Sequence, residues 1–179
     1  MSNALIVVDM QRGFMAPGGT LYCGDAARAI IPPVRLLIES EAGRGALVIF
    51  TADTHAPDDK EFAMFPPHCV AGTPEVEIIP ELADLAAQHA VLPKRRYSAF
   101  FDTDLGEQLA AFGPEQIIVV GDCTDICVLH TVAGLRDRDY RVIVRSDLVE
   151  TYDAPGHPAD EVNACALAHL RDVLGAEVV

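Results

Sequence analysis

Residues 117–128 have the sequence IIVVGDCTDICV, and this stretch decides the fold class that we expect for the chain. Its four leading β-branched residues are typical of a strand buried on both faces of a parallel sheet. Gly121 ends the apolar run, and apolar residues then recur at helical spacing from about Asp125 onward. The stretch therefore predicts a buried strand that leads into a helix.

Cys127 lies near the first turn of that predicted helix. Ligands of open α/β sheets bind at this edge, and the dipole of a helix favours a thiolate near its N-terminus. Free cysteine is also among the most buried residue types, so Cys127 is either a small core residue or a nucleophile. The stretch by itself leaves both interpretations open.

Composition limits the classes of function. The chain has 179 residues, a formal net charge of −14 and a sequence pI of about 4.6. Such an acidic chain is a poor partner for nucleic acid or an anionic membrane, but it can bind a neutral or cationic small molecule. Because the length suits a single core and no internal repeat is visible, we expect one domain over residues 1–179.

The compartment is predicted from apolar runs and cysteines. No apolar run approaches membrane-spanning length, and the short run at 5–8 lacks the flanks of a signal peptide. The cysteines are odd in number and scattered, which argues against a disulfide framework and for a reducing, cytoplasmic setting. They are Cys23, Cys69, Cys123, Cys127 and Cys165.

Predicted strands and helices alternate along the chain, which indicates an α/β fold with a parallel sheet flanked by helices on both faces. The first helix is expected to have Asp25 as N-cap and a break or second start at Pro32-Pro33, and Asp102 or Thr103 is expected to cap the third. Strands are predicted at 4–8, 47–53, 91–92, 117–120, 142–144 and 177–179, and helices through 25–38, 81–89, 109–112, 125–138 and 158–174.

Charged side chains stand at the ends of these strands. Asp9, Asp53, Lys94 and Asp122 each follow an apolar strand, and right-handed crossovers would bring them to one edge beside Cys127. When it is considered alone, an Asp at the end of a strand is often a turn residue, and a Lys at such a position is often a solvated surface residue. Together, an acid can take the proton of a thiol while a lysine holds the acid and stabilises the thiolate.

The segment after the second strand carries candidate metal ligands. Asp53 and His55 are separated by one residue, so a strand places both side chains on the same face. Glu61 and His68 follow in a long Pro-rich loop. Two imidazoles with carboxylates suit zinc, iron or manganese, although an Asp-x-His pair with a distant His also arises by chance.

Aromatic residues occur in the loops next to these candidates. Phe14, Phe65, Tyr97 and Phe100 are each in such a loop. Loop aromatics either cover the core or, near one polar site, form walls for a flat apolar ring.

Five pieces of the sequence resemble the nicotinamidase/pyrazinamidase branch of the isochorismatase-like cysteine hydrolases. They span nearly the whole chain in the order and at the spacing of that family. The pieces are LIVVDMQ at 5–11 with Phe14, DTH at 53–55, FPPHCVAGT at 65–73, KRRYSAF at 94–100 and GDCTDICV at 121–128.

The resemblance implies a six-stranded parallel sheet and a catalytic triad. Asp9 matches the proton acceptor of the family, Lys94 its electrostatic partner and Cys127 its nucleophile. The backbone amides of Cys123 and Cys127 match an oxyanion hole, and the family has a cis peptide bond just before the position of Cys123.

The resemblance also implies a metal and a ring-binding pocket. Asp53, His55 and His68 match the metal ligands, and Glu61 matches a further ligand or a carboxylate that binds through water. The ion, with zinc favoured over iron or manganese, would bind the ring nitrogen of the substrate. The positions matching ring-packing residues are Phe14, Phe65 and Tyr97.

The implied activity is hydrolysis of nicotinamide, and of pyrazinamide, to the acid and ammonia through a thioester on Cys127. A homo-oligomer acting on a small amide, in NAD salvage or degradation, is the setting that the family suggests.

Three rival interpretations remain. Another hydrolase of the superfamily, acting on a carbamoyl or ureido amide or on isochorismate, would use Cys127 without the metal residues. A non-haem iron oxygenase uses two histidines and a carboxylate, but it leaves Cys127 and Lys94 unexplained. A redox or metal-binding module would use Cys123 and Cys127, which would lie one turn apart on a helix.

Overall fold

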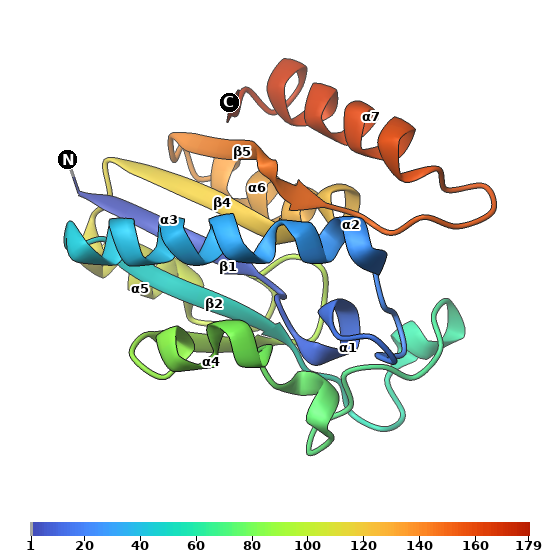
Figure 1. The fold of residues 1–179 in the computed structure, drawn as a ribbon. Helices are drawn as coiled ribbons and strands as arrows, with labels where there is room; N and C mark the ends of the chain where they lie inside the picture. The colour runs from blue at the N-terminus through green and yellow to red at the C-terminus, as the bar shows by residue number, and fades with distance from the viewer. Residues whose placement is uncertain (1) are drawn as a thin grey trace.

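A six-stranded parallel sheet forms the centre of the protein, of which the computed structural model describes residues 2–179 (Figure 1). The strand order is β3-β2-β1-β4-β5-β6, and all neighbouring strands are parallel. The strands are β1 (Asn3–Val8), β2 (Leu47–Asp53), β3 (Ala90–Lys94), β4 (Gln116–Asp122), β5 (Val142–Glu150) and β6 (Glu177–Val178).

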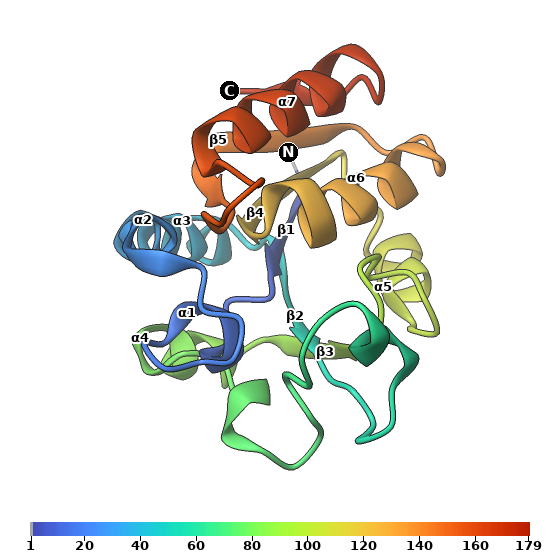
Figure 2. The ribbon, with the colours of Figure 1, turned by 90° about the vertical axis from the view of Figure 1, so that its right-hand side faces the viewer.

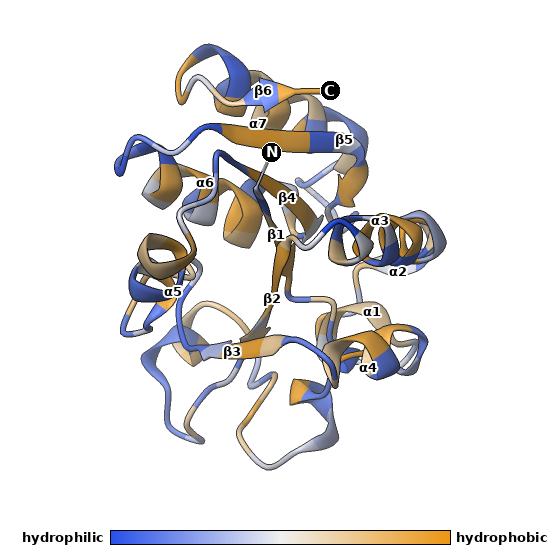
Figure 3. Ribbon diagram, turned by 90° about the vertical axis from the view of Figure 1, so that its left-hand side faces the viewer, coloured by the Kyte–Doolittle hydropathy of each residue, from blue (hydrophilic) through white to orange (hydrophobic). Residues whose placement is uncertain are grey.

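Helices cover both faces of the sheet, and Figure 3 shows the apolar strands between the two helical layers. One layer contains α1 (Arg12–Met15), α2 (Gly24–Ala29), α3 (Ile31–Gly43) and α4 (Pro80–Ala86), and the other contains α5 (Leu105–Phe112), α6 (Leu129–Arg136) and α7 (Ala159–Asp172). Short helices complete the chain: the 3₁₀ turns η1 (Lys60–Ala63) and η2 (Pro74–Val76), and the π-helix η3 (Thr124–Val128).

The two layers bury separate cores because side chains alternate along each strand. Leu5 and Val7 of β1 pack with the first layer, whereas Ile6 and Val8 pack with the second. β1 and β4 lie in the middle of the sheet and are buried on both faces, as their continuous apolar runs predict. The predicted fold class is confirmed.

Several predicted boundaries of helices need correction. A second helix, α3, does start at this point, with Ile31 as its first residue and Pro32 in its first turn, but the N-cap of α2 is Cys23 rather than Asp25. The N-cap of α5 is Asp104, one residue after Thr103, whose hydroxyl accepts a 3.4 Å hydrogen bond from the Leu105 amide.

The predicted helix over 125–138 is two helices in the structure. The Cys123 carbonyl accepts hydrogen bonds from the amides of both Ile126 and Val128, at 3.2 and 3.1 Å, and the second of these is the wide turn of a π-helix. Regular α-helix begins only at Leu129. Cys123 therefore precedes the helix, and it does not lie one helical turn before Cys127. The helix predicted over 81–89 also ends early, at Ala86, because the chain enters β3 at Ala90.

No helix among residues 2–179 is long and apolar enough to cross a membrane.

Gly121 sets how closely β4 approaches β1 near their ends. Its φ is +115°, and a Cβ atom there would lie 2.2 Å from the carbonyl oxygen of Val8. A side chain would push apart the strand ends that lead to Asp9 and Asp122.

We expect Gly121→Ala to lower the free energy of unfolding by about 2–3 kcal/mol, because it combines backbone strain with a clash against rigid backbone. Urea unfolding measures this, with Gly156→Ala as a control that shares a positive φ but has no atom within 4 Å of the added methyl. Equal losses in the two variants would show that backbone strain alone, and not the approach of β1, requires this glycine.

Candidate functional site

Asp9, Lys94 and Cys127 meet at the carboxyl edge of the sheet, as predicted. Asp9 follows β1, Lys94 ends β3 and Cys127 lies in η3 after β4. The Lys94 Nζ atom is 2.8 Å from Asp9 Oδ2 and donates a hydrogen bond of 3.5 Å to Cys127 Sγ. All three side chains are buried.

Thr51 fixes the carboxylate of Asp9. The Thr51 hydroxyl donates a 2.6 Å hydrogen bond to Asp9 Oδ1, and the Asp9 amide donates a 3.2 Å bond back to the hydroxyl oxygen. Asp9 itself has a φ of 48°, which turns the chain sharply at the end of β1. This leaves Asp9 Oδ2 directed at the lysine.

Burial sets the protonation states of the triad. Burial raises the pKa of Cys127 well above its ordinary value; Lys94 opposes this rise, and the carboxylates of Asp9 and Asp53 add to it. Burial likewise raises the pKa of Asp9, although Lys94 opposes this. The pKa of Lys94 is raised despite burial, because Asp9, Cys127 and Asp53 surround it. Cys127 is thus a protonated thiol at rest and needs a base.

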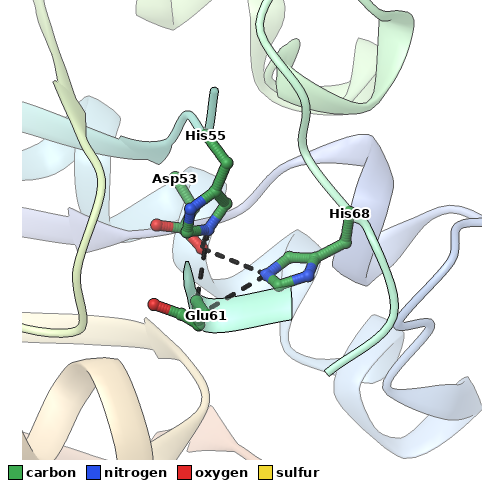
Figure 4. A group of neighbouring side chains, drawn as sticks. All are labelled: Asp53, His55, Glu61 and His68. Carbon is green, nitrogen blue, oxygen red and sulfur yellow. Dashed lines mark hydrogen bonds and ion pairs between the residues drawn. The ribbon is translucent and has the colours of Figure 1, made fainter. Parts of the chain in front are cut away.

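Asp53, His55, Glu61 and His68 form the second cluster, and Figure 4 shows their side chains turned toward one another. The Nε2 atoms of His55 and His68 lie 2.9 and 3.5 Å from Asp53 Oδ2, and each lies 3.9 Å from Glu61 Oε1. All four side chains are buried, and one donor atom from each lies within 4.8 Å of the others.

The chemistry of this donor set fits a divalent ion of the zinc, iron or manganese class. The His55–Asp53 separation of 2.9 Å is that of a hydrogen bond, and the longer separations of 3.5 and 3.9 Å are ones that two ligands of a single ion also show. Burial raises the pKa of Glu61, whereas Lys94 and the two histidines hold the pKa of Asp53 below its usual range against the effect of burial.

Outer residues orient the two imidazoles. His68 Nδ1 is 2.8 Å from the carbonyl oxygen of Pro66, and His55 Nδ1 is 3.2 Å from Asp59 Oδ2. Asp59 also accepts a 2.9 Å hydrogen bond from the Glu61 amide and pairs with Arg96 at 2.8 Å. Such contacts leave Nε2 of each imidazole facing the cluster.

Gln11, Thr51 and Asp59 support the site but were missed from the sequence. The Gln11 side chain accepts a 2.6 Å hydrogen bond from the Asp53 amide and donates a 3.0 Å bond to the Asp53 carbonyl, which fixes the end of β2. The signal in the sequence that could have identified Gln11 and Thr51 is a polar residue close to the end of an apolar strand; the structure shows that both are buried. Asp59 lies in an Asp-Asp-Lys run that looks solvated.

One pocket, with a cavity of about 260 Å³, joins the two clusters. Its lining includes Asp9 and Cys127 of the triad and three of the metal candidates. Of the predicted aromatic walls, Phe14, Phe65 and Tyr97 line it. Phe100 does not, because its ring packs against the hydrophobic core and lies 4.0 Å from the guanidinium of Arg138. For Phe100 the other predicted alternative holds, in which a loop aromatic covers the core.

The peptide bond between Asp122 and Cys123 is cis. Asp122 ends β4 at the same edge, where it and Cys123 also line the pocket.

Comparison with known proteins gives one family. The model of the isochorismatase domain matches residues 3–173. A pyrazinamidase/nicotinamidase from Streptococcus mutans UA159 has 32% identity and a TM-score of 0.91, over 99% of this chain and 100% of that one.

Two further solved structures are similar over nearly their whole lengths. A pyrazinamidase of Pyrococcus horikoshii in complex with zinc has 31% identity and a TM-score of 0.87, over 100% of this chain and 99% of that one. An N-carbamoylsarcosine amidase from Thermoplasma acidophilum has 33% identity and a TM-score of 0.85, over 99% and 95%.

Proposed function

Since the chain belongs to the isochorismatase family of hydrolases, we propose that it is a metal-dependent amidohydrolase that converts nicotinamide, and also pyrazinamide, to the acid and ammonia. The observation that carries the proposal is the link between the clusters: Asp53, a metal candidate, lies 3.1 Å from the Lys94 Nζ atom of the triad. An ion held there would share one pocket with the thiol of Cys127.

The triad performs the chemistry of the proposed reaction. Asp9 takes the proton of Cys127, while Lys94 stabilises the charge of both groups. The thiolate attacks the amide carbon, and the backbone amides of Cys123 and Cys127 stabilise the oxyanion, a contribution of about 10²–10³ in rate per donor. Asp9 returns the proton to the leaving ammonia, and water then hydrolyses the thioester.

Asp53, His55, Glu61 and His68 would hold one divalent ion, with zinc favoured over iron or manganese. Such an ion would supply a Lewis acid for the ring nitrogen of the substrate, which would orient the amide. Phe14, Phe65 and Tyr97 would flank the ring, because they line the pocket beside both clusters.

Removal of the ion is expected to abolish turnover of nicotinamide, and zinc, iron or manganese should restore it. His68→Ala should lose the ion and at least about 10²-fold in kcat/KM, since it removes a ligand. Metal content and ammonia release measure both effects, and His169→Ala, at an exposed helical position, is the control. Full activity in metal-free protein would contradict the proposed role of the ion.

A second candidate substrate class is a carbamoyl or ureido amide, favoured by the similarity to the N-carbamoylsarcosine amidase. Ammonia release from nicotinamide, from a carbamoyl-amide panel and from an isochorismate control distinguishes the candidates. Activity that is confined to carbamoyl amides and indifferent to chelator would keep Cys127 as nucleophile and reject the nicotinamide proposal.

Residues 1–179 would act as one domain within a homo-oligomer, which light scattering of the purified protein tests.

A further inference from the structure

Three donor side chains line the same pocket and have no part in the proposed reaction: those of Cys23, Asp122 and Cys123. Cys23 precedes α2, Asp122 ends β4 and Cys123 follows it, so the chain brings them together from distant positions. One donor atom from each lies within 4.8 Å of the other two.

Asp122 is an unpartnered buried carboxylate. Its exposed fraction is 1%, and neither of its oxygens accepts a hydrogen bond from residues 2–179. A buried charge is strongly destabilising without a partner, so the group either keeps a proton or holds a cation.

The two thiols have the spacing of ligands on one ion. Cys23 Sγ and Cys123 Sγ are 3.6 Å apart. Tetrahedral zinc with Zn–S bonds of about 2.3 Å separates two thiolates by about 3.8 Å, so almost no movement is needed. Two thiols in simple contact have a similar spacing, and the unpartnered carboxylate beside them is what distinguishes this trio from packed cysteines.

We propose that Cys23, Asp122 and Cys123 form a second metal site, for a thiophilic divalent cation of the zinc class. Two S–H bonds and one O–H bond break, two metal–sulfur bonds and one metal–oxygen bond form, and three protons leave to solvent. The site then carries a net charge of −1, and water occupies the fourth position. Because the ion replaces protons, binding strengthens as pH rises.

Cobalt titration tests the proposal, because thiolate-to-cobalt charge transfer absorbs in the near ultraviolet and the Asp53 cluster offers no thiolate. The titration uses phosphine-reduced protein that carries Cys127→Ala, so that the nucleophile cannot contribute. We expect two bound equivalents, of which one gives the absorption. Cys23→Ser and Asp122→Asn should each weaken that equivalent at least about 10-fold, whereas Cys165→Ser, at an exposed cysteine, should not.

A titration in which no thiolate-to-cobalt absorption develops, or an absorption that survives both Cys23→Ser and Asp122→Asn, would overturn the proposal. The binding readout is independent of amide hydrolysis, so it stands apart from any failure of the proposed function.

A second measurement needs no substitution at the site and covers the case in which a variant fails to fold. Mass spectrometry follows alkylation of each thiol with and without zinc. Zinc should protect Cys23 and Cys123 together and leave Cys165 reactive. Equal alkylation of the pair in both conditions, or a Cys23–Cys123 disulfide formed in place of zinc binding, would also overturn the proposal.

Discussion

Cys127→Ala is expected to abolish amide hydrolysis while the protein still binds one divalent ion at the Asp53 cluster. The change removes the only thiol in contact with Lys94 among the described residues, and the neighbouring acid and lysine cannot supply a nucleophile. Loss of a nucleophile from a triad typically costs about 10⁴-fold or more in kcat. Cys127 is not one of the four metal candidates, so metal content should be unchanged.

Ammonia release and metal analysis of the same preparation measure the two halves of this prediction. Cys165→Ser, at an exposed position on α7, is the matched control and should keep both properties. If the alanine variant kept turnover, the thioester mechanism would be rejected. If the variant lost its bound metal as well as its turnover, the triad and the metal cluster would form one unit rather than two.

Lys94→Met should be the most destabilising change at the site, as well as an inactivating one. The ammonium lies 2.8 Å from Asp9 and 3.1 Å from Asp53, and all three groups are buried. Removing it leaves two carboxylates close together without a cation. Breaking a buried ion pair in this way typically lowers the free energy of unfolding by about 3–5 kcal/mol.

Urea unfolding of metal-free protein measures this loss. Adding Asp9→Asn to Lys94→Met should restore part of the stability, because it removes one of the two charges, but it should restore no activity. Arg95→Met is the control: the adjacent side chain is exposed, pairs with Asp102 and lies over the ring of Phe101 at the surface, so the expected change is within about 0.5 kcal/mol. Similar stability losses in the Lys94 and Arg95 variants would show that the buried pair adds nothing.

The strand ends and the triad were predictable because each buried run ends abruptly at a charged residue. Four apolar residues before Asp9 and four before Gly121-Asp122 predict adjacent central strands, and crossover handedness then brings their ends together. The metal candidates were predictable because the alternation of a strand places Asp53 and His55 on the same face, and because of the family resemblance. These signals are local, so a single sequence carries them.

Other features depend on contacts that no local pattern records. The pairing of Thr51 with Asp9 and of Asp59 with His55 follows from the way neighbouring segments pack. The π-helix of Cys127 has the same residue types as an α-helix, and only the hydrogen bonds of the Cys123 carbonyl distinguish them. Cys23 and Cys123 are far apart in sequence, so no local pattern predicts their contact.

The two clusters are built from the chain in different ways. The metal candidates all lie within the single segment 53–68, whereas the triad is collected from the ends of β1 and β3 and from the turn after β4. If the proposed function holds, a change in the loop after Asp53 could alter substrate selection while the strand ends that carry the triad stay as they are. The Asp53–Lys94 contact is where the two clusters meet, so it is the point at which a change in the loop would have to remain compatible with the triad.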